Sequence, residues 1–232
     1  MKISGLVQAR MGSVRLPGKV MKKIVGKPLI GHIFDRLKKV SGLENIILAT
    51  TIDPQNDELV CYAKKQNILI YRHTEEDDII ARLYEAAELY KADAILKVNA
   101  DCPLVDPIHL DIAIKLYKEA KEPIDIASNK IKKTFPEGYS YELVSIEALK
   151  WCNDNLDKPI ERELAILWII NNSKQFPNRL IIENIKDYSE FGFTVDTKED
   201  FDLVSKIYKK LYKHNKYFGM DEVITFIKSV TK

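Results

Sequence analysis

Short apolar runs recur along the first half of the chain and alternate with segments whose apolar residues have helical spacing. The runs are rich in Ile, Val and Leu, which is typical of buried strands. They cover residues 3–7, 46–51, 68–71, 94–98 and 124–127. Because neighbouring parallel strands need crossover connections, usually helical ones, this alternation predicts βαβ units and a largely parallel sheet.

Residues at the expected helix starts support the same alternation. Pro28 stands where a first-turn proline is tolerated, and an apolar stripe of helical spacing follows it. Asp78 can cap a helix, and Thr197 with Asp200 resembles a capping box with Asp in place of Glu. The amphipathic residues 221–230 predict a last helix that closes the domain against the sheet.

The regular alternation of strand-like and helix-like segments ends at about residue 129. The stretch KIKKTFPEGYSYELVS indicates a polar loop and a short strand, and PIERELAILWIINN predicts one helix with a strongly apolar face. Strand signals return at residues 180–182 and 193–195. Without a repeat or a composition break, we expect a single domain over residues 1–232, in which residues of about 130–175 form an excursion for substrate binding or dimerisation.

Charge and composition exclude several classes of partner. The 36 basic and 34 acidic residues leave a net charge of only +2, so no footprint for nucleic acid or an anionic membrane is visible. No apolar segment has the length of a membrane span, and the first residues lack the pattern of a signal peptide. We expect a cytoplasmic protein whose three cysteines, in no metal-binding spacing, are reduced thiols.

The densest cluster of candidate chemistry is QARMGSVRLPGK, which directly follows the first predicted strand. Ligands of open parallel sheets bind beyond the carboxyl ends of the strands. The two glycines allow the backbone to approach a ligand closely, and Arg10, Arg15 and Lys19 are spaced to surround a polyphosphate. Five residues separate the glycines and no G-x-G occurs, which excludes the Walker and dinucleotide loops. The alternative is a solvated basic loop.

Two carboxylates follow other predicted strands. Asp101 in NADCPLVDP and Asp196 in FTVDT both stand where side chains point into the crevice at the edge of the sheet. Mg²⁺ needs only one or two protein carboxylates when phosphates and water complete its shell. The alternatives are a turn residue for Asp101 and a helix cap for Asp196.

Five segments in a fixed order resemble cytidylyltransferases that activate acidic sugars. They are QARMGSVRLPGK with the following GKPLI, ILATTIDPQND, EEDDIIARLYEAAELYKAD, NADCPLVDP and TVDTKEDF, and they span about residues 3–200. The resemblance is to the acylneuraminate and 3-deoxy-manno-octulosonate cytidylyltransferases, and especially to the spore-coat polysaccharide SpsF-like branch.

This resemblance implies a three-layer α/β/α, Rossmann-like fold of the nucleotide-diphospho-sugar transferase type with a mostly parallel sheet. It also implies Mg²⁺-dependent transfer of CMP from CTP to an acidic sugar for surface polysaccharide synthesis, with release of pyrophosphate. By similarity, Arg10, Lys19 and Asp101 are catalytic, and Asp101 and Asp196 bind the metal. The nucleotide-binding residues implied by the resemblance are Ala9, Arg10, Gly12, Ser13, Arg15, Lys19 and Arg82. Without the resemblance, Arg82 could be a helix-surface cation paired with Asp78.

The acceptor half departs from the SpsF-like pattern. Glu142, Arg162 and Glu163 match substrate-binding positions, but Ser140 replaces an acidic residue and Leu164 replaces a histidine. A polyol phosphate or phosphonate acceptor, or a nucleotide-binding domain without catalysis, therefore stays open. So does the simpler possibility that the three matching side chains only face water.

An apolar face within the predicted excursion indicates a homodimer. It consists of Ile160, Leu164, Leu167 and Trp168. The alternative is that this face covers the core of its own domain.

Overall fold

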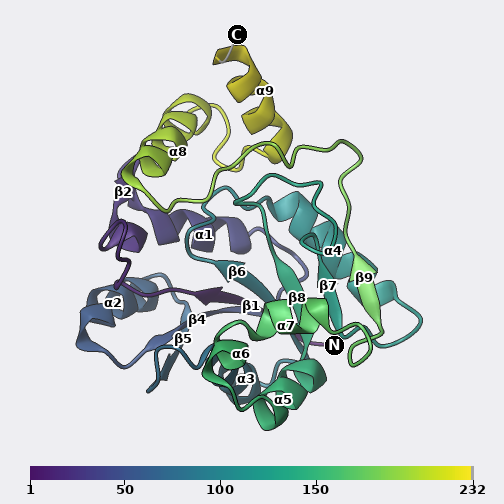
Figure 1. Ribbon diagram of the computed structural model, residues 1–232. Helices are drawn as coiled ribbons and strands as arrows, with labels where there is room; N and C mark the ends of the chain where they lie inside the picture. The colour runs from purple at the N-terminus through teal and green to yellow at the C-terminus, as the bar shows by residue number, and fades with distance from the viewer. Residues whose placement is uncertain (231–232) are drawn as a thin grey trace.

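The computed structural model describes residues 1–230, and in them a sheet of seven strands lies between two layers of helices (Figure 1). The strand order is β5-β4-β1-β6-β8-β7-β9. The bounds are β1 Ile3–Gln8, β4 Asn45–Thr51, β5 Leu69–His73, β6 Ala94–Asn99, β7 Ile126–Ser128, β8 Glu142–Ser145 and β9 Arg179–Ile181. Every strand is parallel to its neighbours except β8, which is antiparallel to both β6 and β7. The predicted three-layer, mostly parallel α/β class is confirmed.

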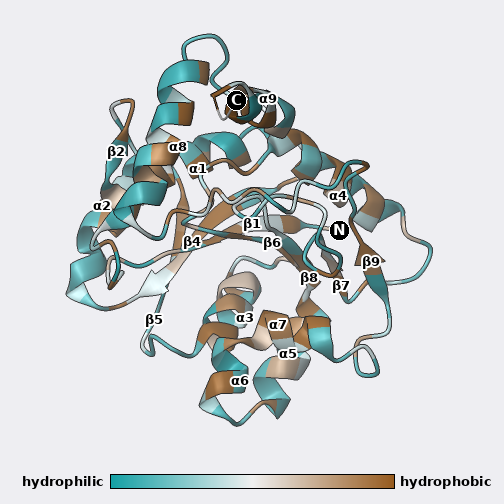
Figure 2. Ribbon diagram, turned by 45° about the horizontal axis from the view of Figure 1, so that its top comes forward, coloured by the Kyte–Doolittle hydropathy of each residue, from teal (hydrophilic) through white to brown (hydrophobic). Residues whose placement is uncertain are grey.

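Alternate residues of the central strands pack against the two helical layers. In β1, Val7 belongs to one buried cluster and Leu6 to the other, because successive side chains of a strand point to opposite faces. The helices on the Val7 face are α1 Leu29–Leu37, α2 Asp57–Lys65, α4 Pro107–Glu119, α8 Lys198–Leu211 and α9 Met220–Val230. The Leu6 face is covered by α3 Ile79–Leu89, α5 Ile146–Asn155 and α7 Ala165–Asn171, with α6 Pro159–Glu163 beside α3. Figure 2 shows mostly hydrophobic central strands between helices that carry both hydrophilic and hydrophobic residues.

Three short elements lie in the connection that follows β1: the 3-10 helix η1 Lys19–Met21 and the two-stranded hairpin of β2 Lys23–Ile24 and β3 Lys27–Pro28. A second 3-10 helix, η2 Pro54–Asn56, follows β4. Among residues 1–230, none of the helices is both long enough and apolar enough to cross a bilayer. All three cysteines are free thiols.

Two local predictions are wrong. The single helix expected over PIERELAILWIINN is divided into α6 and α7 at Leu164, whose φ of −100° and ψ of 25° leave the helical region. Residues 193–195 form no strand of the described sheet. Val195 N instead donates to Asp101 O at 2.9 Å, so this segment lies along the end of the sheet.

The register at the centre of the sheet decides where ligands can bind. Gln8, the last residue of β1, pairs with Asn99, the last residue of β6. The loop after β1 and the loop after β6 therefore leave the sheet side by side at its carboxyl edge. That edge is where parallel α/β sheets form ligand crevices.

Candidate active site

The loop after β1 is held by contacts of its own backbone. Met11 N donates to Asn56 Oδ1 at 2.8 Å, and Met11 O accepts from Ser13 N and Gly18 N. Gly18 has a φ of 64°, a conformation that favours glycine, and this turn delivers Lys19 to the start of η1.

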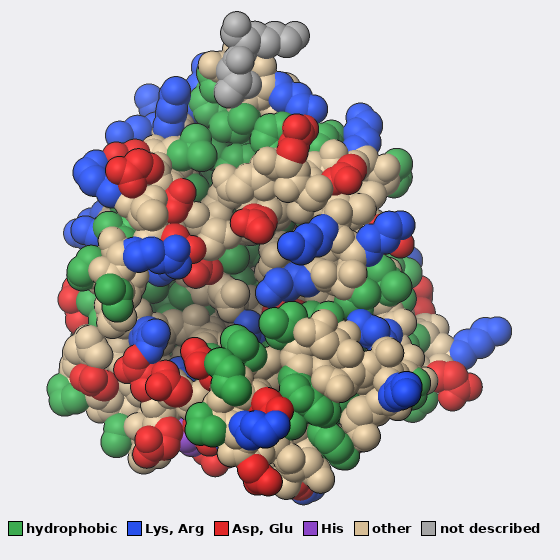
Figure 3. All heavy atoms as spheres, in the orientation of Figure 1, with side chains coloured by type: hydrophobic (Ala, Val, Ile, Leu, Met, Phe, Trp, Pro, Cys, Tyr) green, Lys and Arg blue, Asp and Glu red, His purple; other side chains and the backbone are tan. Residues whose placement is uncertain are grey.

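A cavity of about 430 Å³ lies beyond the carboxyl ends of β1 and β6. Figure 3 shows this face of the molecule with a hollow rimmed by both acidic and basic side chains. Ten of the twelve predicted site residues line the cavity: Ala9, Arg10, Gly12, Ser13, Arg15, Lys19, Arg82, Asp101, Glu163 and Asp196. The other two, Glu142 and Arg162, are not among its lining residues in the described chain.

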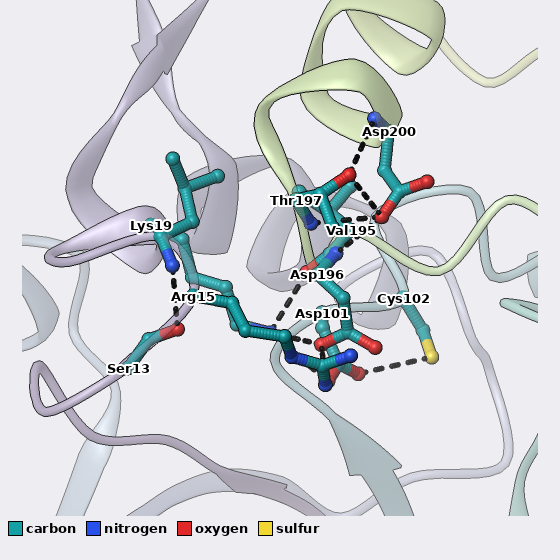
Figure 4. A network of polar contacts seen from close by, with 10 residues as sticks. Ser13, Arg15, Lys19, Asp101, Cys102, Val195, Asp196, Thr197 and Asp200 are labelled. Atoms are coloured by element: carbon teal, nitrogen blue, oxygen red, sulfur yellow. Dashed lines mark hydrogen bonds and ion pairs between the residues drawn. The ribbon is translucent and has the colours of Figure 1, made fainter.

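Lys19 joins the two predicted carboxylates (Figure 4). Its Nζ lies 2.9 Å from Asp196 Oδ1 and 3.3 Å from Asp101 Oδ2, and it donates to Val195 O at 2.7 Å. The Lys19 side chain is 12% exposed, so water screens these ion pairs only in part. Segments from three distant parts of the chain thus meet at one ammonium group.

The end of the cavity at Asp196 is stabilised by the start of α8. Thr197 Oγ1 accepts from Asp200 N at 3.3 Å, and Asp200 Oδ2 accepts from Thr197 N at 2.8 Å, which completes the predicted capping box. Asp200 Oδ2 also accepts from Asp196 N at 3.0 Å, while Arg15 Nη2 lies 3.0 Å from Asp196 Oδ1. The cap of α8 therefore holds the backbone that carries Asp196, and it leaves the Asp196 carboxylate for Lys19 and Arg15.

Arg82 is buried under the opposite wall of the cavity. It is 2% exposed, its Nη2 donates to Glu76 O, and its Nε has no hydrogen-bond partner in the described chain. Burial, and then the nearby Arg10 guanidinium, lower the pKa of Arg82. The alternative of a surface cation paired with Asp78 is wrong, because Arg82 lies inside and the carboxylate of Asp78 pairs with Arg162.

Arg162 is a structural cross-link. Its Nε donates to Asp78 Oδ2 at 3.0 Å, and its Nη1 donates to Asn153 O at 2.9 Å and to Leu156 O at 2.8 Å. These bonds tie α6 to the start of α3 and to the end of α5. Arg162 therefore does not face water, and it is not among the residues that line the cavity in the described chain. Its neighbour Glu163 does line the cavity.

Glu142 is buried beside the cavity. It is 2% exposed and lies between Lys97 and Lys130, with Oε2 3.6 Å from Lys97 Nζ and Oε1 3.1 Å from Lys130 Nζ. Burial alone would raise the pKa of Glu142, but the two lysines lower it below its ordinary value. The alternative of a water-facing Glu142 is therefore wrong.

Four polar residues that line the cavity were not predicted as site residues: Gln8, Glu76, Asp77 and Asn99. Glu76 forms an ion pair with Arg10, and Asn99 accepts from Lys97 Nζ at 2.7 Å. The acidic run EEDD, four residues after a predicted strand, was the available signal for Glu76 and Asp77. Asn99 could have been found as the last residue of the strand that leads to Asp101.

The residue set fits a divalent cation that is shared with phosphates. Within residues 1–230 there is no group of three or more acidic, His or Cys side chains that could enclose a metal. Asp101 and Asp196 nevertheless approach the same ammonium, so their oxygens are near one another. One or two carboxylates suit Mg²⁺, which takes its other ligands from substrate phosphates and water.

A mostly parallel sheet with cations after its first strand and two carboxylates opposite them defines an α/β protein of the nucleotidyltransferase type. A family model described as cytidylyltransferase matches residues 4–221, and the chain belongs to the cytidylyltransferase family. The family predicted from the sequence is thereby confirmed.

Individual relatives agree with this family. The structure of a cytidylyltransferase from Leptospira borgpetersenii superposes with a TM-score of 0.93 at 30% identity, covering 100% of this chain and 95% of that one. The spore coat polysaccharide biosynthesis protein SpsF of Bacillus subtilis is 24% identical over 88% of this chain and 85% of its own. A 3-deoxy-manno-octulosonate cytidylyltransferase of Geobacter metallireducens is 32% identical over 57% of this chain and 51% of its own.

Proposed function

We propose that the protein transfers CMP from CTP to an acidic sugar of the nonulosonic or 3-deoxy-octulosonic type, for surface polysaccharide synthesis. The observation that carries the proposal is the convergence of Lys19 on Asp101 and Asp196 inside a cavity at the end of β1. The relative that is a 3-deoxy-manno-octulosonate cytidylyltransferase supports an acidic sugar as the acceptor.

In this proposal the loop after β1 binds the triphosphate. Arg10, Arg15 and Lys19 are its charged donors, Ser13 adds a hydroxyl group, and Ala9 and Gly12 line the cavity close to the bound phosphates. Arg82, with an unpartnered Nε at the wall of the cavity, contacts the base or the ribose.

The reaction exchanges one phosphorus–oxygen bond for another. The anomeric oxygen of the acceptor forms a bond to the α-phosphorus of CTP, the bond from that phosphorus to the bridging oxygen breaks, and pyrophosphate leaves. The hydroxyl proton of the acceptor goes to solvent or to a nearby base. Arg10, Arg15 and Lys19 stabilise the negative charge that grows on the phosphate oxygens. Mg²⁺ held by Asp101 and Asp196 would neutralise part of the phosphate charge.

A pyrophosphate-release assay tests the proposal. The protein is incubated with CTP and Mg²⁺ and, in turn, with N-acetylneuraminic acid, 3-deoxy-manno-octulosonic acid and glycerol 3-phosphate. We expect turnover with an acidic sugar, its loss on chelation of the metal, and a decrease of at least about a hundredfold in Asp101→Asn and in Asp196→Asn. Asp202→Asn, in an exposed ion pair with Lys198, is the control. Absence of both CTP binding and turnover would reject the proposal.

A second candidate is transfer to a polyol phosphate or a phosphonate. It is favoured by Ser140 and Leu164, which stand where the SpsF-like pattern has an acidic residue and a histidine. The same assay separates the two, because glycerol 3-phosphate carries no carboxylate. A binding domain without catalysis would bind CTP tightly and release no pyrophosphate.

We also propose that the protein is a homodimer that buries the face of α6 and α7. Ile160, Leu164 and Leu167 are 57%, 45% and 48% exposed, which is unusual for large aliphatic side chains placed together. Trp168 instead stacks on Trp151 with ring centroids 5.4 Å apart. This residue therefore packs against its own domain and is not part of the proposed dimer face. Light scattering should give about twice 26.7 kDa, and Leu167→Glu should give a monomer.

A further inference from the structure

A compact group of charged side chains lies on the far side of β6 from the phosphate loop. The sheet order places β1 on one side of β6, and β8 and then β7 on the other. Lys97 of β6 pairs in register with Glu142 of β8, which pairs in turn with Ser128 of β7. Lys130 follows two residues after the end of β7. These three charged residues therefore share the carboxyl edge of the sheet with the cavity.

The group carries an excess positive charge where charge is costly. Lys97 and Glu142 have side chains only 9% and 3% exposed, and their ion pair uses the single acid of the group. Lys130 approaches the same carboxylate at 3.1 Å, but its side chain is 43% exposed. Glu142 thus pairs with two lysines. The ammonium group of the more exposed one, Lys130, has three donors and still has some of them free for a ligand.

The group is in contact with the cavity. Lys97 Nζ donates to Asn99 Oδ1 at 2.7 Å, and Asn99 and Asp101 both line the cavity. Glu142 raises the pKa of Lys130, and Cys102 and Asp101 add smaller effects in the same direction. A ligand in the cavity that extends past Asp101 toward β8 would reach Lys130.

The backbone around Lys130 is braced. Lys130 N donates to Ser128 Oγ at 3.0 Å. Asn129 Nδ2 donates to Tyr139 O at 2.9 Å, and Asn129 Oδ1 accepts from Tyr141 N at 3.2 Å. This clasp joins the end of β7 to the GYSYE segment, so Lys130 starts from a fixed position and its donors need little ordering to bind a ligand.

We propose that Lys130 binds the anionic group of the acceptor. Glu142, which is paired with Lys97, holds the Lys130 side chain in position for this contact. The inference rests on the proposed function and deepens it, because it assigns the acceptor half of the site to β6, β7 and β8. A carboxylate at Lys130 would balance the excess charge of the group. It would also place the acceptor on the side of Asp101 opposite the phosphate loop. The anion can come from a sugar carboxylate or from the phosphate of a polyol phosphate.

Binding measurements on the full chain test this assignment. N-acetylneuraminic acid, 3-deoxy-manno-octulosonic acid and glycerol 3-phosphate are titrated by calorimetry, with and without Mg²⁺ and a non-hydrolysable CTP analogue. We expect Lys130→Met to weaken binding of the preferred acceptor about 10- to 100-fold, the loss of one charge-assisted hydrogen bond, with unchanged affinity for the CTP analogue. Lys130→Arg should restore part of the affinity. Lys133→Met, at an exposed lysine of the same loop, should have no effect.

The outcomes separate this inference from the proposed function. Equal acceptor affinity in the wild type and in Lys130→Met overturns the inference and leaves CMP transfer intact. If the protein binds the CTP analogue but no anion of the panel, the inference is also overturned. Failure to bind the CTP analogue, together with absence of turnover with CTP, rejects the proposed function, and the titrations without nucleotide still decide whether Lys130 binds an anion. Preference for the acids or for glycerol 3-phosphate identifies the source of the anion.

Discussion

Lys19 Nζ lies 3.3 Å from Asp101 Oδ2, although 82 positions separate the two residues in the sequence. The same nitrogen lies 2.9 Å from Asp196 Oδ1. In this arrangement the lysine offsets part of the negative charge of the two carboxylates that are proposed to hold the metal. A bound triphosphate offers Lys19 a different partner, so cation binding and nucleotide binding should be coupled.

Removal of Lys19 should uncouple metal binding from the nucleotide. We expect Lys19→Met to bind Mn²⁺ without nucleotide about fivefold more tightly than the wild type, because Asp101 loses its competing cation and Asp196 keeps only Arg15. Affinity for CTP should fall by at least about tenfold, since a phosphate donor is lost. Electron paramagnetic resonance measures free Mn²⁺, and calorimetry measures CTP. Lys22→Met, at an exposed position in the same connection, is the control, and unchanged Mn²⁺ affinity in Lys19→Met would contradict the coupling.

Arg82 should determine nucleotide affinity and not acceptor affinity. Lysine at this position keeps a charge but loses the planar set of donors, including the unpartnered Nε. We expect Arg82→Lys to raise KM for CTP about tenfold and to leave KM for the acceptor unchanged. Arg72→Lys, in an ion pair with Asp57 away from the cavity, is the matched control. A change in acceptor KM alone would place Arg82 in the other half of the site.

The cap of α8 should contribute measurably to stability. Thr197→Ala removes the hydroxyl group that accepts from Asp200 N, and we expect a loss of about 1 kcal/mol in the free energy of unfolding. Thr197→Ser keeps this hydroxyl group and should lose much less. Urea unfolding followed by circular dichroism gives both values. Equal stability of the Ala and Ser variants would show that the hydrogen bond contributes nothing.

His32 should make the fold sensitive to acid. Its Nε2 lies 2.8 Å from Ile24 O, and burial, followed by Lys27 and Arg36, lowers its pKa from 6.5 to about 4. Between these two values the unfolded chain binds a proton that the folded chain does not, so stability falls as the pH decreases from 6.5 toward 4. The contribution of this group reaches about 3 kcal/mol and becomes constant below the folded pKa.

Comparison with His32→Gln isolates this effect from the other titrating groups. Glutamine can still donate to Ile24 O but does not titrate. We expect the difference in unfolding free energy between the wild type and His32→Gln to change by about 3 kcal/mol between pH 7 and pH 4. A pH-independent difference would show that the pKa of His32 is not lowered in the folded protein.

Local signals in the sequence determined most of the framework. Apolar periodicity predicted five strands and their intervening helices, because buried faces repeat with the geometry of each element. Asp78 and the Thr197–Asp200 box were recognisable as helix caps, since a cap depends on residues three positions apart. The loop after β1 was recognisable from its glycines and cations, and Asp101 and Asp196 from their positions after predicted strands. The resemblance to a known family added Arg82 and Glu163 to the predicted lining, but not Glu76, Asp77 or Asn99.

Tertiary structure alone decided which of these side chains meet. The pairing of Arg162 with Asp78 and the position of Glu142 between Lys97 and Lys130 join residues that are distant in sequence. The burial of Arg82 likewise depends on the segments packed around it. The division between α6 and α7 is equally invisible in the apolar pattern, which continues through Leu164. Periodicity records which face of an element is buried but not which element covers it. The insertion of antiparallel β8 between β6 and β7 is what brings Glu142 to Lys97 and Lys130, and no local signal predicts that strand order.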